Sequence, residues 1–298
     1  MRLLIIGLDG LDARYVERWS LRGLQQAYWG QHYVGFLKKL YTPILWSCFL
    51  TGLNVEEHGY DLERLRYKRG EDALPPIVRP FYALRKKLLP SHVKLGIRWF
   101  LAKLRVTRRC PPSNMPSGLR RRSFLEVFKS SGLHVQALEV PGYNEQWNEY
   151  FRTACDVFFT APLSARLRVM NYCIRECERR VSLAVKALSK RKRPDVLMVY
   201  FPMPDIAHHL LLKGIRAIRE LHRAYWLAER WVETIKEMAG PDYICLIVSD
   251  HGFERAEKTH SDYGFWSLNV EPPFRPERIT DFYRLIMELA ARLRLRLG

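Results

Sequence analysis

Three short apolar runs stand out along the chain, over residues 3–8, 196–201 and 243–248. Continuous apolar runs of this length are typical of strands that are covered on both faces, as in a parallel sheet. Apolar residues recur at helical spacing over about residues 216–238, between the second and third runs. This stretch suits the crossover helix of a βαβ unit, so we expect the runs to form the centre of a parallel sheet.

The rest of the pattern continues this alternation of strands and helices. It predicts a helix around residues 124–129, a strand over 134–140, a long amphipathic helix over about 163–190 and a closing amphipathic helix over 279–297. Such alternation predicts an α/β fold, a three-layer α/β/α sandwich in which helices cover both faces of a mostly parallel central sheet. The length fits a single domain over residues 1–298.

Residues 64–122 break the alternation and differ in composition from the rest of the chain. They contain 17 Lys or Arg against two acids, so they carry +15 of the formal net charge of +18. We interpret them as a basic insertion that forms a cap or arm, with an amphipathic basic helix over residues 92–106. The charge points to phosphate, nucleic acid or an anionic lipid surface as partner, although a solvated surface is the simplest explanation for residues 120–122.

Composition excludes several classes of protein. With 48% hydrophobic and 12% aromatic residues, the chain is not disordered. No window approaches the roughly 18 consecutive apolar residues of a spanning helix, and the first apolar run is too short for a signal peptide, so we expect a soluble or peripheral protein. The six cysteines are scattered through a large chain, which favours reduced thiols and a cytoplasmic location.

Each of the three apolar runs leads into an acidic residue. Asp9 follows the first run, Asp205 comes shortly after the second, and Asp250 follows the third. Any one of them alone could be a helix cap. Parallel strands end at the same edge of a sheet, however, and open α/β sheets bind their ligands there, so we expect the three carboxylates to converge.

Histidines accompany these acids. His209 lies four residues after Asp205, His251 follows Asp250 directly, and His260 comes nine residues later in a polar loop. Carboxylate oxygens and imidazole nitrogens in this number suit two divalent ions, with zinc as the first candidate and manganese as the second.

A nucleophile for metal-assisted chemistry is available in residues 41–53. This segment offers the hydroxyls of Thr42, Ser47 and Thr51 and the thiol of Cys48. The residue types alone do not decide among these four groups.

Four blocks of sequence carry a family resemblance. In chain order they are Ile5-Ile6-Gly7-Leu8-Asp9-Gly10; Thr42-Pro43 with Thr51-Gly52-Leu53-Asn54 and His58-Gly59; Pro204-Asp205-Ile206-Ala207-His208-His209; and Ser249-Asp250-His251-Gly252. Together they resemble the type I phosphodiesterase and nucleotide pyrophosphatase family of the alkaline phosphatase superfamily. The resemblance extends from near the N-terminus to about residue 269, and as a set the blocks are specific.

The resemblance implies an alkaline phosphatase-like catalytic domain with Thr42 as its nucleophile. The family's nucleophile lies nine residues before the Thr of the Thr-Gly pair, which is Thr51 here. Related sulfatases have a cysteine at this position and an arginine four residues later, where this chain has Thr42 and Trp46, so a sulfatase is disfavoured. By the same resemblance, one ion is held by Asp9, Thr42, Asp250 and His251, and the other by Asp205, His209 and His260.

The activity that the resemblance implies is hydrolysis of a phosphate diester or pyrophosphate, with a phosphate-ester small molecule such as a nucleotide as substrate. Two ions about 4 Å apart would lower the pKa of the Thr42 hydroxyl and stabilise the leaving oxygen. Thr42 would form a covalent phosphothreonine that water then hydrolyses, with overall retention at phosphorus. The family's spacing selects His209 and leaves out His208, which we expect to pack beside the site.

One position departs from the family's pattern. Nucleotide pyrophosphatases often have an Asn five residues after the His of the His-Gly pair, where this chain has Glu63. An acceptor thus replaces a donor to the phosphate, and Arg64 or Arg66 of the basic insertion are the candidates to supply the missing positive charge.

Two alternatives to the diesterase stay open at this point. One is a phosphomonoesterase or phosphomutase of the same superfamily. The other is a basic protein that binds nucleic acid or a membrane surface through residues 64–122. The complete set of seven ligands favours an enzyme, because a binding protein has no need of them together with a hydroxyl.

Overall fold

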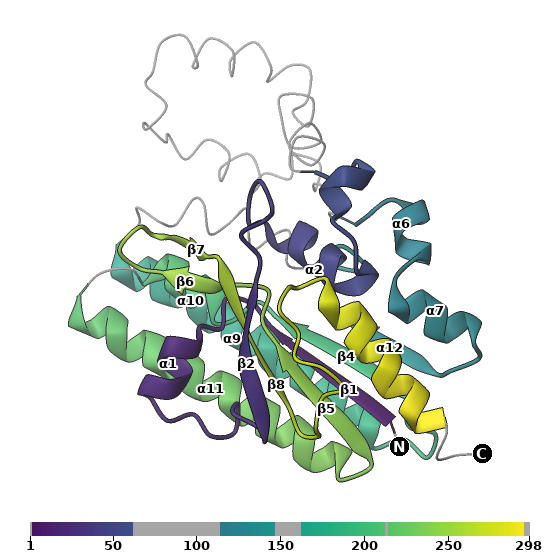
Figure 1. The fold of residues 1–298 in the computed structure, drawn as a ribbon. Coiled ribbons are helices and arrows are strands. Elements are labelled where there is room, and N and C mark those ends of the chain that lie inside the picture. Colours follow the sequence, from purple (N-terminus) through teal and green to yellow (C-terminus); the bar gives the residue numbers. More distant parts are fainter. Residues whose placement is uncertain (1, 62–113, 147–161, 212–213, 295–298) are drawn as a thin grey trace, which may run out of the picture.

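The computed structural model describes residues 2–61, 114–146, 162–211 and 214–294. Most of the predicted basic insertion, including the helix expected over 92–106, lies outside these residues. Glu63, Arg64 and Arg66 also lie outside them. Within the described part, a six-stranded sheet has helices on both of its faces (Figure 1).

The sheet has the strand order β2-β8-β5-β1-β4-β3, and β6 and β7 form a separate two-stranded ribbon. The strands are β1 (Arg2–Leu8), β2 (Tyr28–Tyr33), β3 (Val135–Leu138), β4 (Val196–Phe201), β5 (Tyr243–Val248), β6 (Gly252–Glu254), β7 (Thr259–Ser261) and β8 (Tyr263–Leu268). The helices are α1 (Ala13–Arg18), α2 (Thr42–Thr51), the 3₁₀ helix η1 (Val55–His58), α6 (Ser117–Arg121), α7 (Phe124–Ser130), α9 (Leu163–Leu188), α10 (Asp205–Leu210), α11 (Ile215–Ala239) and α12 (Asp281–Arg294).

The centre of the sheet is parallel, as predicted. β1 pairs in parallel with β4 on one side and β5 on the other, and β3 pairs in parallel with β4. All residues of β4 and β5 are buried, which explains why their sequences are continuous apolar runs instead of alternating ones. The fold is therefore the predicted three-layer α/β/α sandwich.

Two antiparallel strands, which the apolar pattern did not predict, complete one side of the sheet. β8 pairs antiparallel with β5, and β2 pairs antiparallel with β8 at the edge. The sequence of β2, Tyr-Trp-Gly-Gln-His-Tyr, contains no continuous apolar run, because only two of its residues are buried. An edge strand that exposes one face carries a weaker sequence pattern than a central strand does.

Alternate residues of each central strand contribute to two separate hydrophobic cores. Leu4 and Ile6 of β1 belong to the core beneath α1, α9, α10 and α11, whereas Leu3 and Ile5 belong to the core beneath α2, α7 and α12. These two groups of helices cover opposite faces of the sheet (Figure 1).

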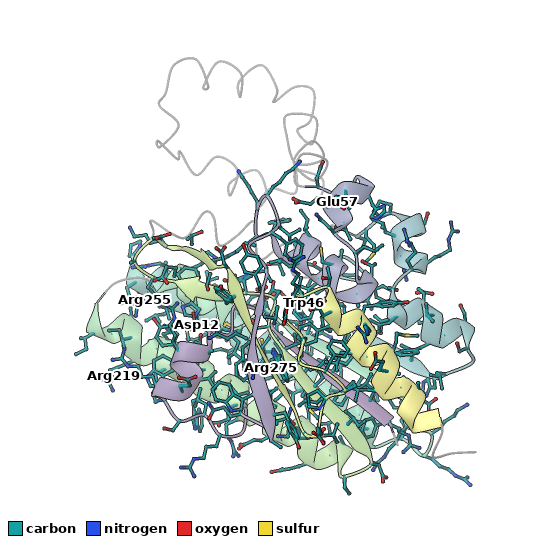
Figure 2. All side chains as sticks on the ribbon, viewed as in Figure 1. Asp12, Trp46, Glu57, Arg219, Arg255 and Arg275 are labelled. Carbon is teal, nitrogen blue, oxygen red and sulfur yellow. The ribbon has the colours of Figure 1, made fainter. Side chains whose placement is uncertain are left out.

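Helix α2 is packed unusually close to the sheet. All ten of its residues are buried, and it ends at Gly52, whose φ of 69° is a conformation that favours glycine. A Cβ atom at Gly7 of β1 would lie 2.5 Å from the Cη2 atom of Trp46, which sits in the interior of the molecule (Figure 2). The glycine thus allows α2 to lie directly against the central strand, which fixes the position of its N-terminus.

The cysteines of the described residues are structural. Cys48, Cys173, Cys177 and Cys245 are free and buried, and Cys173 and Cys177 pack in the core beneath α9 and α11. Among the helices of the described residues, none is both long and apolar enough to cross a bilayer.

Candidate metal centre

The three strand-end carboxylates converge, as the topology requires. Asp9 follows β1, Asp205 is the first residue of α10, and Asp250 comes two residues after the end of β5. The backbone N–H of Asp205 donates a hydrogen bond to the carbonyl oxygen of Asp9 over 2.9 Å. The N–H of Gly10 donates to Oδ1 of Asp250 over 3.4 Å, so the chain itself holds the acidic residues together.

Gly10 makes this close approach feasible. Its φ is 68°, and a Cβ atom at this position would lie 2.7 Å from the Cβ and 2.8 Å from the Cα of Asp205. A side chain here would therefore push α10 away from β1. Gly10 is therefore required for Asp9 and Asp205 to lie this close together.

Six of the seven predicted ligands lie in one cluster. The ligand atoms of Asp9, Asp250 and His251 lie within 4.8 Å of one another, and so do those of Asp205, His251 and His260. The two groups share His251. His209 joins them, because its Nε2 lies 3.2 Å from Oδ1 of Asp205 and 3.0 Å from Nε2 of His260.

Backbone carbonyls orient two of the imidazoles toward the cluster. Nδ1 of His260 donates a hydrogen bond to the carbonyl oxygen of Leu40 over 2.9 Å, and Nδ1 of His251 donates to that of Gly252 over the same distance. A carbonyl oxygen only accepts, so these bonds place a proton on Nδ1 of each ring and turn Nε2 toward the cluster. This is the arrangement that metal-bound histidines adopt.

The cluster contains buried polar atoms that make no well-formed hydrogen bond and whose close polar neighbours are other ligands of the cluster, as for Oδ1 of Asp9 and Nε2 of His251, 3.2 Å apart. They are Oδ1 of Asp9, Oδ1 of Asp205, Oδ2 of Asp250 and Nε2 of His251. Buried polar atoms in native proteins are almost always satisfied, and burying a carboxylate is costly unless a cation compensates it. Converging oxygen and imidazole donors of this kind fit divalent ions such as zinc or manganese.

The electrostatics of the cluster agree with a site for cations. Burial and the negative charge of Asp9 raise the pKa of the Asp250 carboxyl well above its usual range. Burial lowers the pKa of His251, but the charges of Asp250, Asp9 and Asp205 outweigh it and raise that pKa to about 10. In the bare protein, protons therefore offset part of the excess negative charge that bound cations would neutralise.

Thr42 begins helix α2 and is buried, with 4% of its surface exposed. The other candidate nucleophiles of this segment are engaged within the helix. Ser47 donates a hydrogen bond to the carbonyl of Pro43 over 2.6 Å, and Thr51 donates to that of Ser47 over 2.7 Å. Burial raises the pKa of the Cys48 thiol to about 12, so little reactive thiolate exists at neutral pH.

The bond from His260 links the cluster to this helix. Leu40, whose carbonyl accepts it, lies two residues before Thr42. Thr42 is the first residue of α2, so it lies at the N-terminal end of the helix, which favours anions. The threonine thus belongs to a strand-to-helix segment that is held to the predicted ligands.

Sequence reasoning missed one residue of the cluster, Tyr200. Its phenol donates a hydrogen bond to Oδ2 of Asp9, which leaves Oδ1 of that carboxylate facing the cluster. Tyr200 stands within the apolar run of β4, where it is indistinguishable from a core aromatic residue. Its position five residues before Asp205 was the available clue.

His208 packs beside the cluster, as expected. It is buried, its Nε2 lies 2.8 Å from the hydroxyl of Tyr225, and its ring stacks on Phe253 with centroids 4.6 Å apart. Burial lowers its pKa to about 3, so it is neutral at physiological pH.

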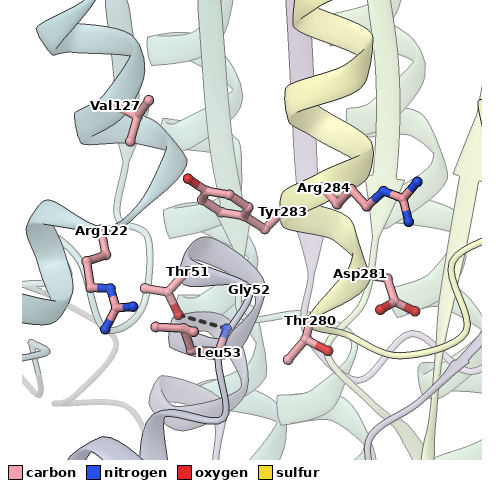
Figure 3. A pocket seen from close by; sticks show the side chains of 9 residues that line it. All are labelled: Thr51, Gly52, Leu53, Arg122, Val127, Thr280, Asp281, Tyr283 and Arg284. Atoms are coloured by element: carbon pink, nitrogen blue, oxygen red, sulfur yellow. Dashed lines mark hydrogen bonds between the residues drawn. The ribbon is translucent and has the colours of Figure 1, made fainter.

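A separate pocket of about 540 Å³ lies at the other end of α2 (Figure 3). It is lined by Thr51, Arg122 and Tyr283 among others, and includes none of the six clustered ligands. A helix of ten residues places its ends about 13 Å apart, so this pocket is distinct from the segment around Thr42.

Fold and cluster together define an α/β protein whose sheet ends at a group of carboxylates and imidazoles that could hold metal ions. Solved structures agree on the fold. A sulfatase from Bacteroides thetaiotaomicron superposes with a TM-score of 0.55 at 10% identity, over 97% of this chain and 70% of its own. BT1596, a 2-O glycosaminoglycan sulfatase, gives a TM-score of 0.53 at 10% identity over the same shares. At this identity, the likeness concerns the fold alone.

The sequence assigns the family. Residues 109–268, more than half of the chain, match the family described as type I phosphodiesterase / nucleotide pyrophosphatase, and the chain belongs to it. It is therefore a hydrolase that acts on phosphoric ester bonds. The matched range contains Asp205, His209, Asp250, His251 and His260, whereas Asp9 and Thr42 precede it.

Murine ectonucleotide pyrophosphatase / phosphodiesterase 5, solved as an inactive variant with AMP, is also similar, with a TM-score of 0.44 at 12% identity. That comparison covers 85% of this chain and 57% of the murine one, so the chain spans little more than half of that protein. No curated protein sequence matches the chain significantly.

Proposed function

We propose that the protein is a phosphodiesterase or nucleotide pyrophosphatase that uses Thr42 as its nucleophile and two divalent ions, zinc in the first place, as cofactors. The observation that carries this proposal is the cluster of six carboxylate and imidazole ligands at the carboxyl edge of the sheet. A site with unsatisfied buried carboxylates and three histidines is costly for a protein that has no cation to bind.

In this proposal, Asp9, Thr42, Asp250 and His251 hold one ion, and Asp205, His209 and His260 hold the other. When bound, the ions neutralise the charge of the phosphoryl group, lower the pKa of the Thr42 hydroxyl and stabilise the leaving oxygen. Ring nitrogens of His251 lie within 4.8 Å of the ligand atoms of both groups, so its ring stands between the two groups.

The chain's own groups perform the remaining tasks. Thr42 Oγ attacks phosphorus as its proton passes to solvent, and the bond to the leaving oxygen, which takes up a proton from water, breaks. The phosphoryl group stays on Thr42 with its remaining ester group. Attack by water then releases a phosphate monoester and restores the hydroxyl. The bonds from His260 to Leu40 and from Tyr200 to Asp9 hold the segment and the carboxylate in place during both steps.

The proposed substrate is a small phosphate ester, with a nucleotide as the first candidate. The family assignment supports this choice, and Arg64 and Arg66 stay candidates for contacts to the phosphate. We further propose a cytoplasmic location, which the free, buried cysteines of the described residues support.

Turnover of two model substrates tests the proposal. Purified protein is assayed with bis-p-nitrophenyl phosphate and with p-nitrophenyl phosphate, before and after treatment with a chelator and with added zinc or manganese. We expect metal-dependent turnover with preference for the diester, and loss of turnover in Thr42→Ala. Preference for the monoester would instead indicate a phosphomonoesterase, and the absence of metal-dependent turnover would indicate a binding protein.

The covalent step has its own test. Acid quenching during turnover of a slow diester, followed by mass spectrometry of peptides, should find the substrate's phosphoryl group, with its remaining ester group, on Thr42. Phosphate on another residue, or inversion at phosphorus with a chiral substrate, would contradict a single covalent intermediate at this threonine.

A further inference from the structure

The outer face of the first half of helix α11 exposes apolar side chains that have no cover within the described structure. Ile215 is 81% exposed, Ile218 is 44% exposed and Trp226 is 49% exposed. Residues spaced by three, eight and eleven positions lie near one another around a helix, so the three share the solvent side of α11. The opposite side, with Leu221, Tyr225 and others, packs in the core.

Exposed arginines accompany these apolar residues. Arg216, Arg219 and Arg223 all lie on the same half of α11, and all three are exposed. Arg219 projects from the periphery of the molecule (Figure 2). Arg223 has an ion pair with Glu220 over 3.3 Å, which leaves the surface with an excess of positive charge. We name these six residues, Ile215, Arg216, Ile218, Arg219, Arg223 and Trp226, the α11 patch.

The second half of the same helix carries more acidic residues than the first half. Its acidic residues are Glu229, Glu233 and Glu237, and Glu233 pairs with Arg230 over 3.2 Å. Three of the four large exposed apolar side chains of α11 lie in its N-terminal half, and Met238 in the second half is the fourth. The N-terminal half lies at the same edge of the sheet as the metal centre, because α11 returns from the carboxyl end of β4 to the start of the parallel strand β5.

We propose that the α11 patch binds the surface of an anionic phospholipid bilayer. A helix that lies in a membrane interface combines aliphatic and tryptophan side chains, which enter the acyl boundary, with arginines that contact anionic headgroups. The formal net charge of +18 adds long-range attraction to such a surface.

Charge complementarity disfavours the other occupants. In a symmetric pair of chains that meet through this patch, the three arginines of one chain would face those of the other. Nucleic acid would use the arginines and could stack on Trp226, but it offers no apolar surface for Ile215 and Ile218. A bilayer uses all six residues.

Sedimentation with vesicles tests this proposal on the full-length protein. The vesicles contain either phosphatidylcholine alone or phosphatidylcholine with about a third of phosphatidylserine. We expect binding to the anionic vesicles that weakens as salt increases, and little binding to the neutral ones. Failure of the wild-type protein to bind the anionic vesicles at low salt would overturn the proposal.

Two matched pairs of variants locate the contact. Arg219→Gln with Arg223→Gln should weaken binding to anionic vesicles about tenfold or more, whereas Arg121→Gln with Arg284→Gln, on the opposite layer, should leave it unchanged. Ile215→Ser with Ile218→Ser should also weaken binding, whereas Met238→Ser, at the other end of α11, should not.

The outcome that separates lipid from nucleic acid is the response to the isoleucine variant. Equal binding by the wild-type protein and all patch variants would overturn the proposal, because another surface would then bind the vesicles. Binding of single-stranded DNA that is stronger than binding of vesicles and insensitive to the isoleucine variant would also overturn it. Circular dichroism melting curves verify that each variant is folded.

Discussion

Tyr200 of β4 donates a hydrogen bond from its phenol to Oδ2 of Asp9, at the end of the neighbouring strand β1. The bond fixes one oxygen of the carboxylate and leaves the other facing the candidate metal centre. A residue in the interior of the sheet thus determines how a predicted ligand is presented, although it is not a ligand itself.

Replacing Tyr200 by Phe removes this bond and little volume. We expect Tyr200→Phe to bind zinc roughly 10-fold to 100-fold more weakly, because Asp9 loses the group that orients it. Tyr243→Phe is the matched control, since it removes a buried phenol that donates to the carbonyl of Pro194 over 2.7 Å at the opposite end of the sheet. Competition titrations with a zinc indicator compare the two. Equal zinc affinities in the two variants would contradict a positioning role for Tyr200.

Gly10→Ala should destabilise the fold and the centre together. Alanine at this φ of 68° costs about 1 kcal/mol, and its Cβ would also collide with the backbone of Asp205. Gly132→Ala is the control, because Gly132 has a φ of 81° but no atom within 4 Å of an added Cβ. We expect Gly10→Ala to lose roughly 1–3 kcal/mol more than the control in urea unfolding. Equal losses would mean that α10 accommodates the methyl group without strain.

His32 provides a test of stability against pH away from the centre. It is buried beside Phe282, with ring centroids 4.9 Å apart, and burial lowers its pKa to about 3. Below pH ~6.5 the unfolded chain binds a proton at His32, whereas the folded chain does not bind it until about pH 3. The free energy of unfolding therefore falls by up to about 1.4 kcal/mol for each pH unit between these two values. His32→Leu removes this contribution.

The expected result is a difference between the two proteins that depends on pH. Urea unfolding at pH 7.5, 5.5 and 4.5 should show the wild-type protein losing stability more steeply than His32→Leu as the pH falls. His208 and the clustered histidines titrate in both proteins, so they cancel in the comparison. Equal losses of stability in the two proteins would show that burial does not lower the pKa of His32 in the folded protein.

The central layer of the fold was predictable because burial on both faces leaves a direct trace in the sequence. The runs at 196–201 and 243–248 coincide with β4 and β5, and the acids that follow them meet as parallel topology demands. β2 was not predictable in this way, since its partner β8 is more than 200 residues away and its own residues are half exposed. Long-range antiparallel pairing leaves no local pattern.

The ligand set was predictable only in part from residues. Strand-end position indicated Asp9 and Asp250, and the histidines near the acids, His260 included, were candidates from the residues alone. The choice of Thr42 among the hydroxyls and the thiol of its segment required the family resemblance, because residue type alone does not rank these groups. The bond of Tyr200 to Asp9 was not accessible by either route. A phenol within an apolar strand signals packing, and its hydrogen bond appears only once two strands are aligned.

Cys48 and Thr42 should respond in opposite ways to substitution. Cys48 is buried within α2 and its pKa is raised to about 12, so Cys48→Ala should retain metal-dependent turnover within a few-fold, with some loss of stability. Thr42→Ala should lose turnover by about 10³-fold or more. Both are measured as kcat with bis-p-nitrophenyl phosphate. A strong loss in Cys48→Ala, in a protein that still melts cooperatively, would contradict this assignment.

The anomalous scattering of zinc in crystals of the wild-type protein shows whether two ions bind beside Thr42. We expect two peaks, one among Asp9, Asp250 and His251 and the other among Asp205, His209 and His260, with Oγ of Thr42 beside the first. A single peak, no peak at this edge of the sheet, or two peaks that both lie far from Thr42 would contradict it.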